Sequence, residues 1–223
     1  MEKIFEAYQR VGDYAELYDE MMTNSGVFGR AAMKIFWGLD DYSYRKFLKQ
    51  TFAGIPEDFR GRLLEVPVGT GVLSLPQYEK LNGAEIFCVD LSDKMLAVAE
   101  KRAKKLNLRS VKFIQSDVID LPFTDKFFDA VLSINGFHVF GDKVKSFEET
   151  RRVLKDDGIF CGSVYIKGEN TRTDLFVEKF CEPQGFFNPP YDTAESLRRR
   201  LSEYYSKVEV SKIKSFAGFV CVR

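Results

Sequence analysis

The stretch Leu63-Leu64-Glu65-Val66-Pro67-Val68-Gly69-Thr70-Gly71 decides the fold that we expect for this chain. It begins as an apolar run, passes through one acidic residue and ends in two closely spaced glycines. Because glycine has no Cβ, a glycine pair lets the backbone approach a ligand that any side chain would keep away. The stretch therefore predicts a buried strand followed by a ligand-binding loop.

Around this stretch, strand-like and helical patterns alternate. The strand-like runs cover residues 62–66, 85–90, 111–115, 128–134 and 158–166. One intervening helix begins at the N-cap Ser92, and another begins near Asp142 and ends before the turn Asp156-Asp157-Gly158. Such alternation predicts parallel βαβ units.

The two ends of the chain depart from this alternation. Residues up to about 58 are rich in aromatic residues and predict a helical lid. After a helix near Thr193, two strand-like runs, 207–214 and 216–222, follow each other too closely for a crossover helix and predict an antiparallel hairpin. We expect an α/β protein with a Rossmann-like, doubly wound, mostly parallel seven-stranded sheet.

The length of 223 residues predicts one domain with its own core. Within residues 1–223 we expect a helical lid (1–58), a cofactor-binding core (59–166), a cap insertion with a helix (167–205) and the terminal hairpin (206–223).

Composition restricts the partners. Lys plus Arg and Asp plus Glu number 33 each, so no net charge favours nucleic acid. Four scattered cysteines form no CxxC pair, which predicts neither a metal site nor disulfides and fits the cytoplasm. No signal peptide or membrane-spanning run is apparent. We expect a soluble cytoplasmic protein with a small-molecule partner, and a homodimer stays open.

Two further acids follow the next strands, Asp90 after the second and Asp117 after the third. Ligands of open α/β sheets bind outside the carboxyl ends of the strands. There Asp90 can accept from both hydroxyls of a ribose, and Leu91 can cover an adenine. Asp117 can accept from an exocyclic amine, beside the backbone N–H of Val118.

These motifs resemble those of the class I S-adenosylmethionine-dependent methyltransferases over about residues 60–222. They are Glu65-Val66-Pro67-Val68-Gly69-Thr70-Gly71, Val89-Asp90-Leu91-Ser92, Ser116-Asp117-Val118, Phe128-Asp129-Ala130-Val131-Leu132 and Arg152-Val153-Leu154-Lys155-Asp156-Asp157-Gly158. The resemblance implies that Glu65 and the loop Gly69–Gly71 (the glycine loop) hold the methionine end of S-adenosylmethionine. It also implies that Asp90 holds the ribose and Asp117 the adenine. The product would be S-adenosyl-L-homocysteine.

The resemblance defines a candidate cofactor site and one departure from it. The family usually has a glycine where Pro67 stands, and proline has no N–H to donate. The candidate cofactor-binding residues are Glu65, Val66, Pro67, Gly69, Thr70, Gly71, Asp90, Leu91, Ser116, Asp117, Val118, Ser133 and Asn135.

Two other functions compete with this one. A nicotinamide-dependent oxidoreductase also fits two glycines and a later acid, but Ser74 replaces its third glycine and Pro76 disturbs the helix start. A non-catalytic cofactor-binding module is supported only by Pro67. The motif Asn188-Pro189-Pro190-Tyr191 is like that of amino-group methyltransferases, but it lies far from the fourth strand and predicts a turn instead.

The catalytic candidate is His138, the only histidine, in the loop after the fourth strand. Its ordinary pKa suits proton abstraction from a phenol, enol or thiol. The alternative is that His138 caps the next helix or packs under the N-terminal segment. The aromatic helices and the Phe-rich cap predict a small apolar or aromatic acceptor.

Overall fold

The computed structural model describes residues 2–223, which form an α/β fold around one seven-stranded sheet. The strand order is β3-β2-β1-β4-β5-β7-β6. The strands from β3 to β5 pair in parallel, whereas β7 pairs antiparallel with both β5 and β6. The predicted mixed sheet with its terminal hairpin is thus confirmed. The strand bounds are β1 (Arg60–Glu65), β2 (Gly83–Asp90), β3 (Val111–Gln115), β4 (Phe128–Ile134), β5 (Leu154–Tyr165), β6 (Lys207–Ile213) and β7 (Phe216–Val222).

Strand β1 lies at the centre of the parallel part of the sheet. Leu64 is fully buried and pairs with Phe87 of β2 on one side and Val131 of β4 on the other. A parallel strand covered on both faces reads as a continuous apolar run, as Leu63-Leu64 does. The chain winds from β1 toward β3 and then in the opposite direction from β4, so the loop after β1 stands at the topological switch point.

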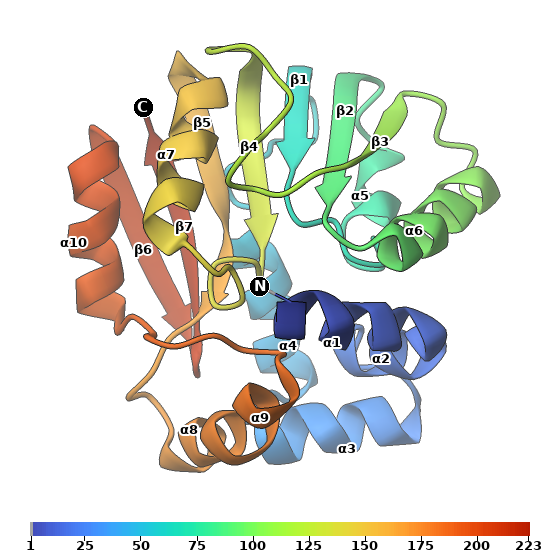
Figure 1. Cartoon of the computed structure of the whole chain (residues 1–223), viewed down its shortest axis with the longest axis vertical. Coiled ribbons are helices and arrows are strands. Elements are labelled where there is room, and N and C mark those ends of the chain that lie inside the picture. Colours follow the sequence, from blue (N-terminus) through green and yellow to red (C-terminus); the bar gives the residue numbers. More distant parts are fainter. Residues whose placement is uncertain (1) are drawn as a thin grey trace.

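Helices cover both faces of the sheet (Figure 1). On one face, α7 (Lys143–Val153) and α10 (Ala194–Tyr204) bury Phe147, Leu197 and Leu201. On the other, α5 (Leu75–Tyr78) and α6 (Asp93–Lys105) bury Leu75 and Leu96. A further helix, α4 (Asp41–Thr51), packs against β5 and β7.

The helix starts follow the signals in the sequence. The Ser92 hydroxyl accepts from the Met95 N–H at 3.3 Å, and the Asp142 carboxylate accepts from the Lys145 N–H at 3.0 Å. Thr193 forms a reciprocal capping box at the start of α10. These caps satisfy N–H groups that have no partner inside a helix. The N-cap at Ser92 and the helix starts near Asp142 and Thr193 had been predicted.

The remaining helices gather beyond the carboxyl ends of the parallel strands (Figure 1). They come from the N-terminal segment and from the segment after β5. Phe36 stacks on Phe176 with ring centroids 4.1 Å apart, and Trp37 stacks on Phe187 at 5.8 Å. The predicted lid and cap therefore share one aromatic cluster. Their helices are α1 (Glu2–Asp13), α2 (Ala15–Met22), α3 (Gly26–Phe36), α8 (Thr171–Phe176), the π-helical turn η1 (Val177–Cys181) and α9 (Glu182–Gln184).

One predicted turn is wrong. Residues 156–158 were expected to separate a helix from the fifth strand, but β5 already begins at Leu154. Leu154 is fully buried and pairs with Phe128, and the register then jumps to the pair Ala130–Ile159. Burial of Leu154 therefore brings the chain into the sheet early, and the polar residues after it form an irregularity inside the strand.

Candidate functional site

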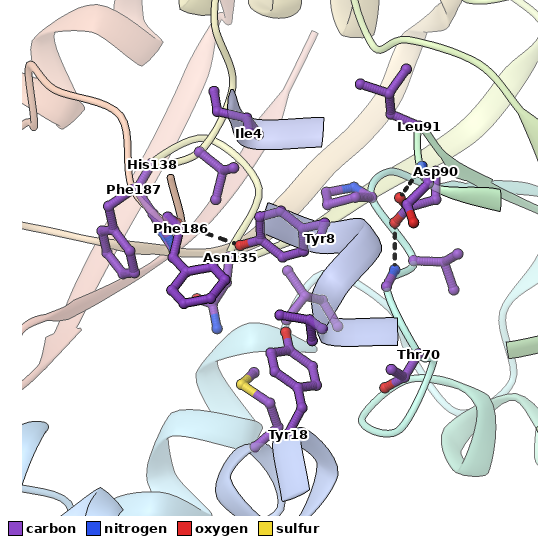
Figure 2. A pocket seen from close by; sticks show the side chains of 18 of the residues that line it. Ile4, Tyr8, Tyr18, Thr70, Asp90, Leu91, Asn135, His138, Phe186 and Phe187 are labelled. Carbon is purple, nitrogen blue, oxygen red and sulfur yellow. Dashed lines mark hydrogen bonds between the residues drawn. The ribbon is translucent and has the colours of Figure 1, made fainter. Parts of the chain in front are cut away.

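A cavity of about 670 Å³ lies at the carboxyl ends of β1, β2 and β4. The N-terminal helices and the segment after β5 form its opposite wall, as Figure 2 shows for Tyr8 and Tyr18 opposite Asp90 and Thr70. The structure thus brings distant parts of the sequence together. The predicted site residues that line the cavity are Glu65, Val66, Pro67, Gly69, Thr70, Gly71, Asp90, Leu91, Ser116, Asp117, Val118, Asn135 and His138.

Ser133 is the predicted residue that does not reach the cavity. Its side chain is fully buried, while the following residues, Ile134 and Asn135, line the cavity. The position of the Ser133 side chain therefore gives no support to its predicted contact with the cofactor, which stays a prediction.

The glycine loop approaches the cavity with bare backbone. Gly69 has a φ of +56°, and a Cβ at this position would meet no atom of the chain within 4 Å. Its N–H donates to the Asp90 carboxylate at 2.8 Å, and the N–H of Gly71 donates to the Val68 carbonyl at 2.9 Å. Both amides are thus used inside the protein, so the loop gives a ligand close approach rather than these two donors.

Pro67 shapes one wall of the cavity. Its ring lies against Gly136 in the loop after β4, where any Cβ would overlap the Pro67 Cδ atom. The ring occupies space that a glycine would leave open, yet the cavity persists beside it. Pro67 therefore changes the shape of the loop and removes one N–H without filling the site.

The carboxylate of Asp90 connects two segments of the predicted cofactor site. Its Oδ2 accepts from the Gly69 N–H at 2.8 Å, and its Oδ1 accepts from the Ser92 N–H at 2.9 Å. Burial raises the pKa of Asp90 to about 6, although these backbone N–H groups act in the opposite direction. At neutral pH Asp90 is therefore mostly ionised, with acceptor capacity left for a ligand hydroxyl.

Glu65 is buried more deeply, at the end of β1. Its Oε2 accepts from the Tyr78 hydroxyl at 2.8 Å and from the Cys88 thiol at 3.7 Å. Burial raises the pKa of Glu65 to about 8, and no cationic group offsets that cost among the causes of the shift. Without a ligand, Glu65 is therefore largely protonated at neutral pH.

The loop after β3 supplies a second, more open acid. Asp117 Oδ1 accepts from the Ile119 N–H at 3.2 Å, while Oδ2 has no hydrogen-bond partner among residues 2–223. Ser116 turns its hydroxyl toward the Asp120 carbonyl at 2.9 Å. Asp117 thus presents one unused carboxylate oxygen near Leu91 and Val118 in the wall of the cavity.

His138 occupies a buried aromatic setting. Its ring stacks on Phe187 with centroids 4.2 Å apart, and its Nδ1 accepts from the Tyr165 N–H at 3.1 Å. Burial, with a smaller effect from Lys143, lowers the pKa of His138 to about 3. Because Nδ1 is an acceptor, the proton of the neutral ring is on Nε2, and neither nitrogen is free to take a proton. This setting does not favour the general-base role predicted for His138.

Several cavity residues were not predicted individually. Tyr8 and Tyr18 reach the cavity from α1 and α2, and the Tyr8 hydroxyl donates to the Phe186 carbonyl at 3.4 Å. Burial raises the pKa of Tyr18 above its ordinary value, so its hydroxyl stays protonated. The aromatic content of the N-terminal segment was the available signal, but helical periodicity alone does not say which rings face a cavity.

Residues 2–223 contain neither a cluster of metal ligands nor a membrane-spanning helix. No three His, Cys, Asp or Glu side chains in this part of the chain lie together as metal ligands would. No helix in the same residues has the length and apolar character needed to cross a bilayer.

The buried acid Glu65 gives a pH-dependent stability. Its pKa is about 8 in the native protein and 4.5 in a model compound, so between these values the native state holds a proton that the unfolded chain has lost. The free energy of unfolding should therefore fall as pH rises through this window. E65Q should remove this loss, with a gain relative to wild type of ~4 kcal/mol from the lower to the upper end of the window, measured by urea unfolding.

The exposed Glu79 provides the matched control. E79Q should keep the wild-type dependence of stability on pH. Equal slopes for wild type and E65Q would contradict a raised pKa at Glu65.

Comparisons with known proteins identify the family. Residues 64–162 match the family model described as "Methyltransferase domain". A demethylmenaquinone methyltransferase of Thermus thermophilus is 40% identical over 97 residues, which cover 44% of each protein. One of Protochlamydia amoebophila is 31% identical over 166 residues, or 71% of this chain and 69% of the relative. A malonyl-[acyl-carrier protein] O-methyltransferase of Geobacter sulfurreducens is 30% identical over 71% of this chain and 55% of the relative.

The match to the Thermus and Geobacter relatives spans about half of their length. The fold is shared over the whole chain with a solved structure from Thermotoga maritima, described as an S-adenosylmethionine-dependent methyltransferase and possible histamine N-methyltransferase. Its TM-score is 0.70 at 17% identity, covering 98% of this chain and 99% of the other. The sheet order also differs from the order 3-2-1-4-5-6 of the dinucleotide-binding fold, because β7 is inserted antiparallel between β5 and β6. The relatives agree with the glycine loop, the strand-end acids and the sheet order. The chain therefore belongs to the family of class I S-adenosylmethionine-dependent methyltransferases.

Proposed function

We propose that this chain transfers the methyl group of S-adenosylmethionine to a small, neutral, apolar or aromatic acceptor. One observation carries the proposal: a single cavity has the strand-end acids on one wall and aromatic side chains on the other. In this proposal residues 1–223 act as one domain, in which residues 59–166 hold the cofactor. Residues 1–58 and 167–205 enclose the acceptor, and residues 206–223 complete the sheet.

The cofactor would be held by the polar wall. Asp90 has acceptor capacity for the ribose hydroxyls, and the unused Oδ2 of Asp117 suits an exocyclic amine of adenine. Glu65 and the glycine loop would face the methionine end, where a cationic amino group would favour the ionised form of Glu65. When bound, S-adenosylmethionine supplies an electrophilic methyl group, and the protein contributes orientation and exclusion of water.

The charges of the cavity wall argue against an anionic acceptor. Its acidic residues are Glu65, Asp90, Asp117 and Asp142, whereas Arg10 is its single cationic residue, because His138 is neutral. Arg10 is exposed and donates to the Gln184 carbonyl at 3.4 Å. A buried anion needs a partner of opposite charge, and the aromatic wall offers none.

The relatives differ in the charge of the acceptor that their names give. One names demethylmenaquinone, an aromatic quinone compound, and another names a malonyl group on a carrier protein, which presents a carboxylate. The apolar wall supports an acceptor of the first kind for this chain. Tyr8, Tyr18 and Phe186 line this wall and are only partly buried, so they supply aromatic surface against which an aromatic ring can pack.

The adenine assignment is tested by a pair of alanine variants in one loop. D117A should weaken binding of S-adenosyl-L-homocysteine about tenfold, because a hydrogen bond to a charged acceptor is lost. Asp120 is exposed and does not line the cavity, so D120A should bind like wild type. Isothermal titration calorimetry measures both, and NAD should not bind. Equal affinities for D117A and D120A would contradict the assignment.

The acceptor class is tested with matched pairs of compounds. Neutral phenols, hydroquinones and thiols are each compared with their carboxylated analogues, for example 1,4-dihydroxynaphthalene with 1,4-dihydroxy-2-naphthoate. Transfer of a labelled methyl group should be at least about tenfold faster to the neutral member, because the cavity lacks a cation for the carboxylate. Preference for the carboxylated members would refute a neutral acceptor. Cofactor binding without transfer to any member would favour the non-catalytic module.

The role of His138 is tested by its pH dependence. A general base with an ordinary histidine pKa would make the rate fall below about pH 6.5, and H138A would cut turnover at least tenfold with little change in cofactor affinity. With its pKa held near 3, His138 is neutral at all ordinary assay pH values. We expect no loss of rate with an apparent pKa near 6.5. A wild-type transition at that pH that H138Q abolishes would restore the base.

A further inference from the structure

One side chain of the N-terminal segment joins three parts of the structure. Asp19, on α2, accepts from the Thr70 hydroxyl at 2.6 Å through Oδ1 and forms an ion pair with Arg102 of α6 through Oδ2. Arg102 also donates to the Thr70 carbonyl. The glycine loop, α6 and α2 therefore meet at a single carboxylate.

This junction lies behind the cavity wall rather than in it. Asp19 does not line the cavity, but its neighbour Tyr18 and its partner Thr70 do. Thr70 follows Gly69, whose N–H donates to Asp90. A continuous path of bonded groups thus runs from α2 through the glycine loop to the acid that faces the proposed ribose position. Figure 2 shows Tyr18 and Thr70 on either side of this part of the cavity.

The other ion pair between these helices and α6 is more exposed. Asp13 and Lys94 form an ion pair at 2.7 Å, with side-chain exposures of 53% and 46%. The corresponding values for Asp19 and Arg102 are 16% and 22%. Exposed pairs contribute little to stability, whereas loss of one partner from a shielded, hydrogen-bonded pair leaves a charge without compensation. Of the two ion pairs, the Asp19 junction is therefore the one whose loss should loosen the contact of α2 with the glycine loop and α6.

We propose that Asp19 is a positioning residue that couples closure of the α1–α2 pair to occupancy of the cofactor site. The inference rests on the proposed cofactor site. A ligand between Asp90 and the tyrosines of α1 and α2 is enclosed while the junction is formed, so its release requires the helix pair to move. Linkage is reciprocal: if the junction favours the bound ligand, the bound ligand favours the closed helix pair.

The test follows release of S-adenosyl-L-homocysteine from the full chain. Trp37, the single tryptophan, lines the cavity and supplies a fluorescence signal for stopped-flow measurements. D19N, which keeps the shape but removes the charge, should release the ligand about tenfold faster than wild type, within the usual range of coupling between sites. Thr70→Val should act in the same direction. D19N removes the ion pair with Arg102 and T70V removes the hydroxyl that donates to Asp19, so both changes weaken the same junction and their effects on the release rate should be less than additive.

Two controls separate coupling from stability. D13N removes the exposed pair from the same helices and should change the release rate less than about twofold. Asp129 lies near the amino end of β4, at the end of the strands away from the cavity. It forms an ion pair with Lys155 and accepts from the Arg62 N–H. D129N should therefore lower the unfolding temperature without changing the release rate.

Hydrogen exchange gives a second readout. Saturating S-adenosyl-L-homocysteine should slow exchange in residues 2–22 of the wild type, and D19N should lose this protection while β1 and β2 keep theirs. Equal release rates for D19N and wild type, or ligand protection of residues 2–22 that persists in D19N, would overturn the role of Asp19. Failure of wild type to bind S-adenosyl-L-homocysteine would instead refute the proposed cofactor site, on which this inference depends.

Discussion

Both oxygens of the Asp90 carboxylate accept backbone N–H groups, one from Gly69 in the loop after β1 and one from Ser92 at the start of α6. These bonds fix two loops from neighbouring strands relative to each other at the edge of the sheet where the cavity opens. They also hold the carboxylate in one orientation, so that its remaining acceptor positions point in defined directions. The geometry of the cofactor wall, and the contact that α2 makes with Thr70, depend on this arrangement.

The opposite wall has a different physical basis. Phe187 stacks between Trp37 of the N-terminal segment and His138 of the loop after β4, with centroid distances of 5.8 and 4.2 Å. Aromatic packing of this kind buries large apolar areas and holds three separate segments together. It also places His138 where water has little access, which explains both its low pKa and its bond to the Tyr165 N–H. His138, which the sequence suggested as a general base, is thus part of a packed wall.

Much of the fold could be predicted because its signals are local. The continuous apolar runs indicated strands covered on both faces, and Ser92 and Thr193 indicated helix starts through bonds to residues three positions ahead. The close spacing of the last two strands required a hairpin. Prediction was weaker where burial decided the outcome, as at Leu154, whose packing in the core starts β5 ahead of the expected turn.

The sequence by itself determined the order of the elements, the glycine loop and the acids at the ends of successive strands, because strand periodicity and parallel connections bring those ends to one edge. Only the tertiary structure decided which side chains face the cavity. It leaves Ser133 outside the cavity lining and bonds Nδ1 of His138 to the Tyr165 N–H. It also brings Asp19 into contact with Thr70, which lies 51 residues later in the chain. These outcomes depend on packing between distant segments, and no local pattern in the sequence encodes the partner that each side chain will meet.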